Sequence, residues 1–251
     1  MRSRFPETLG LEIHRQRLAA IAEEMGATLM RASFSANIKE RRDFSCAVFD
    51  GEGQMLVHAA HIPVHLGSTP MSVEAVRRKL ALQPGQMAMV NDPYEGGTHL
   101  PDVTVVAPVF LDGSEGPAFF VANRAHHADI GGLTPGSLPI ASEVEGQPLT
   151  SDDEGFRTGP EILNDALRQR FCQASRMPTD RMGDLRAQEA ANAVGQRLLQ
   201  KLAAELGMDV FTRQNRALLD YAELRMRAAI RGLGDGRYAF TDFLEDDGAG
   251  G

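Results

Sequence analysis

Imidazole and carboxylate side chains gather in one short stretch of the sequence, residues 91–129. His99 and Asp102 stand just ahead of an apolar run, and His126 and His127 follow a second one. Imidazole nitrogens and carboxylate oxygens are the ligands that zinc, manganese and iron take in proteins. These residue types could therefore hold one divalent cation, if the fold brings them together.

A β-hairpin would bring them together. Two apolar runs rich in Val and Phe, typical of strands, occupy residues 103–110 and 118–122. The sequence DGSEGP between them is typical of a turn. If the runs pair about this turn, Asp102 faces His126 or His127 within roughly 5 Å at Cβ. His99 then lies one step beyond the paired residues, and we predict a metal site at this open end of the hairpin.

A second hairpin is predicted earlier in the chain. Its strands are residues 45–49 and 54–58, and the turn between them reads DGEG. Pairing Ser45 with His58 and continuing outward places Asp43 near His61. From the residues alone, Asp43 is either a buried carboxylate balanced by Arg41 or Arg42, or a further metal ligand.

Two loops beside these hairpins contain further residues that could bind a ligand or a metal ion. Asp92 precedes Gly96 and Gly97, and paired glycines let the backbone pass close to a ligand or adopt positive φ. A tight surface loop is the alternative. His61 and His65 flank a proline, which favours an extended or turning segment over a helix. They either ligate metal or shape the loop through hydrogen bonds.

Composition narrows the class of protein. The chain has 251 residues, 43% hydrophobic and 24% charged, as in globular domains, and its net charge of −8 argues against a nucleic-acid partner. Its cysteines, Cys46 and Cys172, are too few for a disulfide scaffold. It shows neither a signal peptide nor an apolar run of membrane-spanning length. We expect a cytoplasmic protein with no membrane association.

The remaining pattern is helical. Periodic apolar residues predict helices at 7–33, 70–82, 161–175, 180–206 and 209–231, with a short strand at 87–90. His14 is expected to be an ordinary surface or boundary residue. Polar residues recur every four positions on one face of the fourth predicted helix: Asp184, Gln188, Asn192 and Gln196. This pattern predicts a stripe that faces solvent or, alternatively, one that lines a cleft or a subunit contact. Residues 237–244 look like a strand without a partner.

The fold class predicted from these elements is α+β. Antiparallel hairpins with flanking helices fill the N-terminal half, and the C-terminal third is helical. We expect three regions: an α+β metal-site domain at 1–155, a helical region at 156–235, and the start of a β-rich region at 236–251.

Several long motifs, in order along the chain, resemble the hydantoinase B/oxoprolinase family. They are SFSANIKERRDFSCAVFD, HIPVHLG, NDPYEGGTHLPDVTVVAPVF, AHHADIGGLTPGS and GDLRAQEAANAVGQR. Members of the family are about twice this length, so the resemblance covers their N-terminal half.

The resemblance implies a mononuclear site with four ligands: Asp43, His99, Asp102 and His126. Three of them coincide with the hairpin prediction, and Asp43 ranked lower on the residues alone. His65, His127 and Asp129 are implied as residues that orient the ligands. From the residues, Asp92, Gly96 and Gly97 are candidates for a loop beside the ligands or the substrate.

The resemblance also implies an activity, the opening of a hydantoin, oxoproline or lactam ring at the expense of ATP. A hydantoinase A-type partner would phosphorylate the carbonyl oxygen, and hydroxide generated on the metal would attack the activated carbon. ATP is expected on the partner, since this sequence has no Walker loop. A hetero-oligomer such as A2B2 is expected. The alternatives are a subunit of an ATP-dependent ketone carboxylase, which the form of the NIKERRDFSCAVFD run disfavours, and a non-catalytic fragment.

Overall fold

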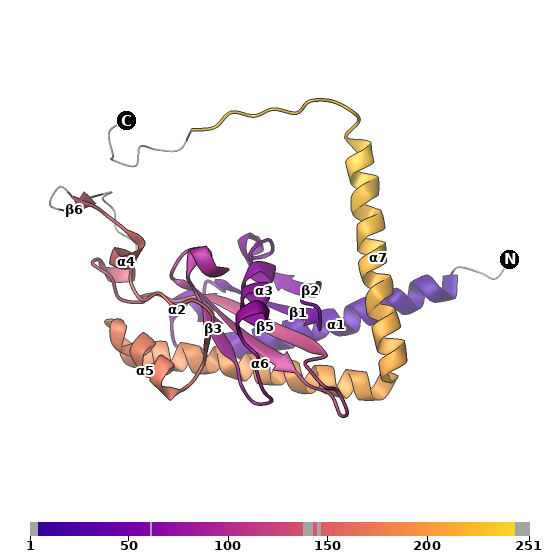
Figure 1. Cartoon of the computed structure of the whole chain (residues 1–251), viewed down its shortest axis with the longest axis horizontal. Coiled ribbons are helices and arrows are strands. Elements are labelled where there is room, and N and C mark those ends of the chain that lie inside the picture. The colour runs from indigo at the N-terminus through magenta and orange to yellow at the C-terminus, as the bar shows by residue number, and fades with distance from the viewer. Residues whose placement is uncertain (1–4, 61, 138–142, 145–146, 244–251) are drawn as a thin grey trace.

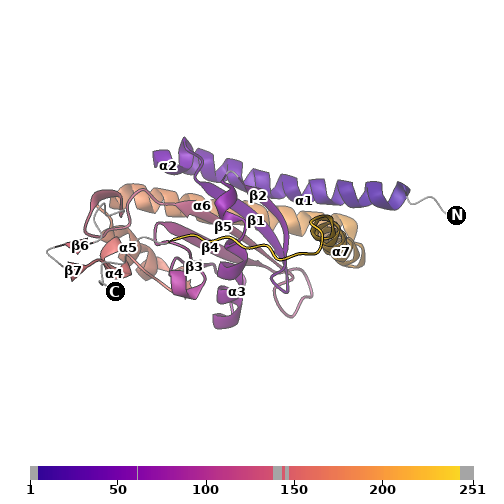
Figure 2. The same ribbon diagram turned by 90° about the horizontal axis from the view of Figure 1, so that it is seen from above.

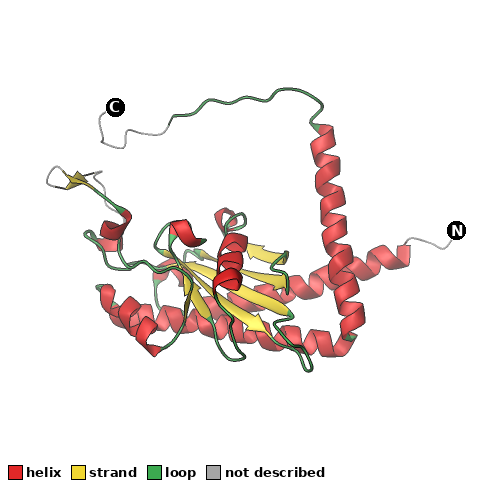
Figure 3. Cartoon of the chain, viewed as in Figure 1, coloured by secondary structure: helices red, strands yellow, loops and turns green. Residues whose placement is uncertain are grey.

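A six-stranded antiparallel sheet lies at the centre of the computed structural model, which describes residues 5–60, 62–137, 143–144 and 147–243. The strand order is β2-β1-β5-β4-β3-β8 (Figures 1 and 3). The strands are β1 (Phe44–Asp50), β2 (Met55–Ala60), β3 (Ala88–Val90), β4 (Asp102–Val109), β5 (Phe119–His126) and β8 (Glu161–Ile162). A separate small ribbon pairs β6 (Glu143–Val144) with β7 (Gln147–Pro148).

Helices cover both faces of the sheet. They are α1 (Phe5–Ala32), α2 (Ala36–Lys39), α3 (Thr69–Lys79), α4 (Ser151–Glu154), α5 (Asp165–Ala174), α6 (Pro178–Leu206) and α7 (Met208–Gly232). The long helices α1 and α6 run side by side across one face, and α3 packs on the other (Figure 2). The α+β class predicted from the sequence is confirmed.

Strand β1 packs against an apolar core on each side because helices cover both faces of the sheet. Phe44 and Val48 pack among the apolar residues of α1 and α6, while Ala47 and Phe49 pack against Val73 of α3. Alternate side chains of a strand point to opposite faces, so a strand in this position reads as a continuous apolar run.

The two predicted hairpins form with small changes. In β4–β5, Asp102 pairs with His126, which decides between the two histidines that the sequence left open. In β1–β2, Ser45 pairs with Ala60, two residues later than predicted, and the register shifts at Val48. An offset of two preserves which face each side chain occupies. His61 lies outside the described residues, so its predicted proximity to Asp43 is not tested.

The polar stripe on α6 faces the sheet, contrary to the predicted exposure to solvent. Asp184, Gln188 and Asn192 are fully buried. The side-chain amides of Gln188, Asn192 and Gln196 donate to carbonyl oxygens of Val103, Val105 and Pro108 at 2.9, 2.9 and 2.6 Å. A four-residue polar period looks the same in sequence whether it meets water or backbone carbonyls, so the sequence could not decide.

Two further predictions are corrected. The predicted helix at 161–175 begins only at Asp165, because Glu161 and Ile162 extend the sheet beside β3. Residues 237–243 form no strand: they run as an exposed segment with Tyr238, Phe240 and Phe243 at the surface, and residue 244 lies outside the described part.

The start of α7 packs on α1 before the helix projects away from the sheet (Figure 1). At that contact His14 is buried, and its Nε2 lies 2.7 Å from Oδ1 of Asn215. The expected surface or boundary position of His14 was therefore wrong, since α7 covers it. In the part of the chain that is described, no helix combines the length and apolar character needed to cross a membrane.

Candidate metal centre

The ends of β4 and β5 bring two imidazoles onto one carboxylate oxygen. His126 Nδ1 lies 3.2 Å from Oδ1 of Asp102, its partner across the ladder. His99 Nε2 approaches the same oxygen to 2.9 Å from the turn that closes onto Asp102, where the Asp102 N–H donates to the His99 carbonyl. The two imidazole rings are 5.0 Å apart between centroids. The predicted meeting of His99, Asp102 and His126 is thus present in the structure.

The other oxygen of Asp102 is held from a different side. Thr98 Oγ1 donates to Oδ2 at 3.2 Å, and His65 Nε2 lies 3.3 Å from it. His65 is buried in a 3-10 turn (Pro63–His65), and its Nδ1 lies 2.6 Å from Ser45 Oγ on β1. The two carboxylate oxygens therefore have different partners: Oδ1 faces the imidazoles of His99 and His126, and Oδ2 is held by Thr98 and His65.

These contacts determine the charge of the group. Burial raises the pKa of Asp102, but hydrogen bonds from His126, His65 and His99 outweigh it and hold that pKa well below its usual range. The hydrogen bond to Asp102 raises the pKa of His99, against its own burial. Asp102 is consequently anionic at neutral pH, as a cation ligand must be.

The donor set fits a divalent cation. Among the described residues, His99, Asp102 and His126 offer ligand atoms that all lie within 4.8 Å of one another. Ligands about 2.0 Å from a tetrahedral ion are roughly 3.3 Å apart. The nitrogen–oxygen separations of 2.9 and 3.2 Å are close to that value.

A cavity of about 470 Å³ opens onto this group. Its lining includes Asp43, Ile62, Val64, Ser68 and Thr98 besides the histidines and Asp102. Asp43 reaches the site through its main chain too, because its carbonyl accepts from the His126 N–H at 3.0 Å. Its carboxylate is not among the three groups that lie within 4.8 Å of one another, so a role as ligand stays a prediction.

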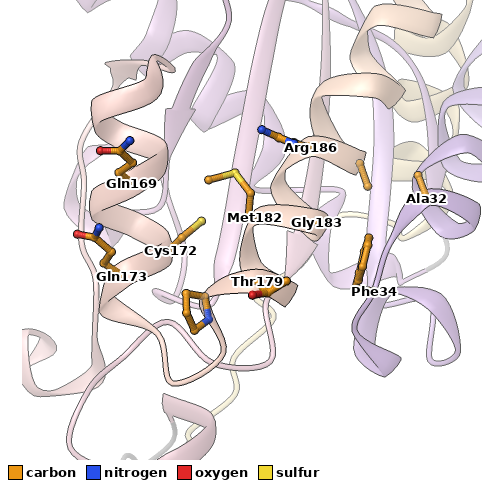
Figure 4. Close-up of a pocket in the computed structure, with 11 residues that line it drawn as sticks. Ala32, Phe34, Gln169, Cys172, Gln173, Thr179, Met182, Gly183 and Arg186 are labelled. Carbon is orange, nitrogen blue, oxygen red and sulfur yellow. The ribbon is translucent and has the colours of Figure 1, made fainter.

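A larger cavity of about 610 Å³ lies elsewhere, between α5, α6 and the segment after α1. Figure 4 shows Phe34, Met182 and Cys172 along it, together with the polar side chains of Gln169, Gln173, Thr179 and Arg186. Burial raises the pKa of the Cys172 thiol, which makes it a poor nucleophile. Size alone would select this cavity, but the residues able to do chemistry line the smaller one.

His127 points away from the metal group. Its Nε2 lies 2.9 Å from Oε1 of Gln188 on α6, and its ring packs edge-on against Phe171. Burial lowers the pKa of His127, so the ring is neutral. Consecutive residues at the end of a strand face opposite sides of the sheet, which separates His127 from His126.

Asp129 also lies apart from the metal group. Its carboxylate accepts from the N–H groups of Gly131 and Gly136 and pairs with Arg176 Nη1 at 3.0 Å. Burial raises its pKa, but these bonds outweigh the burial and lower it. The residue clamps the loop after β5 onto the segment that follows α5.

The loop residues predicted to lie beside the substrate have packing contacts. Asp92 accepts from the Tyr94 N–H and starts the 3-10 turn Pro93–Glu95. Gly96 adopts φ 101°, and a Cβ there would lie 2.8 Å from the Met71 carbonyl oxygen. At Gly97 a Cβ would lie 2.3 Å from the Asn91 carbonyl oxygen. The glycines are thus required by close approach of the chain to itself.

One charged residue at the site was missed from the sequence. Arg124 is fully buried on β5, two residues before His126 and opposite Thr104 of β4. Burial lowers the pKa of Arg124, and the Asp102 charge opposes that shift. An arginine within an apolar strand was the available signal, since such a residue is almost never fully buried without partners.

Comparison with known proteins identifies the family of the chain. The family model described as hydantoinase B/oxoprolinase matches residues 7–249. The chain belongs to the hydantoinase B/oxoprolinase family. The 5-oxoprolinase PfmaA of Pestalotiopsis fici is 39% identical over 89% of this chain, and the match covers 18% of that protein. The chain therefore spans less than a fifth of the length of this relative.

Solved structures share the fold of this family member. The crystal structure of ATP-dependent caprolactamase from Pseudomonas jessenii superposes with a TM-score of 0.84 and 31% identity, covering 95% of this chain and 41% of that one. The nucleotide-free structure of acetone carboxylase gives a TM-score of 0.71 and 19% identity, covering 84% of this chain and 29% of that one. At that identity the second likeness concerns the fold alone.

Proposed function

We propose that this chain carries the divalent-metal site of an ATP-dependent hydrolase that opens small cyclic amides. The observation that carries the proposal is the convergence of His99 and His126 on one oxygen of an ionised, buried Asp102, at the wall of a cavity. The kinship with a 5-oxoprolinase and a caprolactamase supplies the substrate class.

The residues at this site have different roles. Asp102 and the two imidazoles would hold a zinc, manganese or iron ion, which when bound polarises oxygen atoms and makes water more acidic. Asp102 adds negative charge, and His65 keeps its carboxylate oriented through Oδ2. Both histidines must be neutral to ligate, and Asp102 raises the pKa of His99, so cation binding would compete with protonation of that ring.

The cavity suits a small ring. Its volume of about 470 Å³ exceeds that of a lactam or hydantoin, and Ile62 and Val64 give it an apolar wall beside the polar group. The amide carbonyl would face the histidines, and ring carbons would lie on the aliphatic side chains.

Activation of the carbonyl by ATP is assigned to a partner. A hydantoinase A-type subunit would bind and spend the nucleotide, and the two subunits would form a hetero-oligomer such as A2B2 in the cytoplasm. The caprolactamase to which this chain is similar is described as ATP-dependent.

The test uses His99→Ala together with the partner subunit. The substitution removes one imidazole ligand from the surface of the cavity, where His99 is partly exposed, so the fold should survive. We expect metal content, measured by mass spectrometry, and ring opening of oxoproline or caprolactam to fall together, while ATP binding by the partner is unchanged. Undiminished turnover by the alanine variant would end the proposed metal role.

Two alternatives are separated by the same assay. Activity on acetone with bicarbonate, and none on cyclic amides, would identify a ketone carboxylase subunit. A chain that folds and assembles with its partner but binds no metal would be a non-catalytic fragment.

A further inference from the structure

Arg124 lies beneath the metal group in a position that the ligands themselves do not explain. Its side chain is fully buried, yet all its hydrogen-bond partners among the described residues are hydroxyl groups. Nε donates to Thr104 Oγ1 at 2.8 Å and Nη2 to Ser72 Oγ at 2.8 Å. Nη1 donates to Ser68 Oγ and, at 3.4 Å, to Thr98 Oγ1.

Burying a guanidinium without a carboxylate in contact costs free energy unless a nearby anion interacts with its charge. Asp102 is the anion whose charge acts on Arg124. The register of the hairpin explains why. Thr104 faces Arg124 two pairs inward from the pair of Asp102 with His126, so both pairs present their side chains to the same face.

Two arms lead from Arg124 to the anchored oxygen of Asp102. In the first, Arg124 donates to Thr98, and the Thr98 hydroxyl donates to Oδ2 at 3.2 Å. In the second, Arg124 donates to Ser68, whose hydroxyl donates to the carbonyl of His65 at 3.4 Å, and His65 Nε2 lies 3.3 Å from Oδ2. The guanidinium thus contacts Thr98 directly and is linked to the main chain of His65, whose ring also lies 2.6 Å from Ser45 Oγ.

An oxygen held in this way cannot turn toward a cation. A carboxylate can ligate through either oxygen or through both, and the choice changes the coordination geometry. With Oδ2 tied to Thr98 and His65, Oδ1 is the oxygen left facing His99 and His126. We propose that Arg124, acting through Thr98 and His65, is a positioning residue that makes Asp102 a one-oxygen ligand.

This inference rests on the proposed metal site, so its test measures metal binding and not turnover. Thr98→Val removes the hydroxyl with little change of shape, Thr98→Ser keeps it, and Arg124→Met removes the guanidinium. Cobalt(II) serves as the probe, because its visible absorption reports ligand geometry as well as affinity.

We expect Thr98→Val and Arg124→Met to weaken cobalt binding by about 10- to 100-fold, the usual effect of losing a partner that orients a ligand, and to shift the absorption bands. Thr98→Ser should restore both to within about threefold of the parent. Should Arg124→Met fail to fold, as judged by circular dichroism, the valine and serine pair still decides the question.

The outcomes separate the two proposals. A parent chain that binds no cobalt overturns the proposed metal site and this inference with it. A parent that binds cobalt while Thr98→Val binds equally well, with the same spectrum, overturns the role of Arg124 and Thr98 and leaves the metal site standing.

Discussion

Replacing Gln188 by Leu should destabilise the chain strongly, because this buried amide ties α6 to the strand ends that carry the metal group. Its Nε2 donates to the Val103 carbonyl at 2.9 Å, and its Oε1 lies 2.9 Å from Nε2 of His127. Leucine fills a similar volume but removes both bonds. The buried His127 nitrogen loses its partner, and the Val103 carbonyl keeps only its place in the β4–β5 ladder. The unpaired nitrogen costs about 1–3 kcal/mol and the lost bond to the carbonyl about 0.5–1.5 kcal/mol, so the expected loss is about 1.5–4.5 kcal/mol.

That loss is a large share of the 5–15 kcal/mol that typically stabilises a domain. For a chain of this size it corresponds to a fall of roughly 3–18 °C in Tm. The measurement is urea unfolding followed by circular dichroism. The matched control is Gln200→Leu, since Gln200 makes the same kind of bond to the Phe110 carbonyl at 3.0 Å but is exposed. Equal losses in the two variants, or a loss below about 0.5 kcal/mol for Gln188→Leu, would refute the reasoning.

Two further predictions concern stability. Burial lowers the pKa of His14 in the folded chain, so the unfolded chain binds a proton there more readily. The contribution of His14 to stability is therefore fully present above the ordinary histidine pKa of about 6.5, and it is lost as the pH falls below that value. Urea titrations at several pH values should show a smaller fall for His14→Gln. Gly97→Ala should cost several kcal/mol, since the new Cβ would lie 2.3 Å from the Asn91 carbonyl oxygen, whereas Gly67→Ala, with nothing within 4 Å, should be close to neutral in the same assay.

The hairpin that carries Asp102 and His126 could be predicted because its signals are local. Apolar runs on each side of a turn fix strand pairing to within one or two residues. The choice between His126 and His127 needed the register itself, which differs from the sequence estimate by a single residue. A one-residue slip exchanges the faces of a strand, so the last step required coordinates.

Features that depend on distant segments could not be predicted. β8 is a strand only because its two residues meet the edge of β3, some 70 positions earlier in the chain. The hydroxyls around Arg124 come from α3, β4 and the loop before β4, and no local pattern links them. The amide face of α6 has the period of an exposed helix, and only the strand carbonyls opposite it explain its burial.

The number of protein ligands at the centre turns on Asp43, and a single substitution can decide it. Asp43→Asn removes the anionic oxygens but keeps the main-chain carbonyl that accepts from His126, so the positions of His99, Asp102 and His126 should be retained. The carboxylate is near enough for its charge to raise the pKa of His99, after the larger effect of Asp102. We therefore expect Asp43 to ligate, and its loss to weaken zinc or manganese binding by more than about 100-fold, beyond the effect of residues that only orient ligands.

Asp129→Asn is the control for this measurement, since that carboxylate clamps a loop away from the metal group. Binding by Asp43→Asn within about threefold of the parent would show three protein ligands, the number typical of a catalytic zinc with an open fourth position. Loss of binding would show four ligands of mixed nitrogen and oxygen type, and an ion that must also bind water then needs a coordination number above four. That arrangement favours manganese or iron over zinc, so the same titration, run with each metal, tests the identity of the ion along with its ligands.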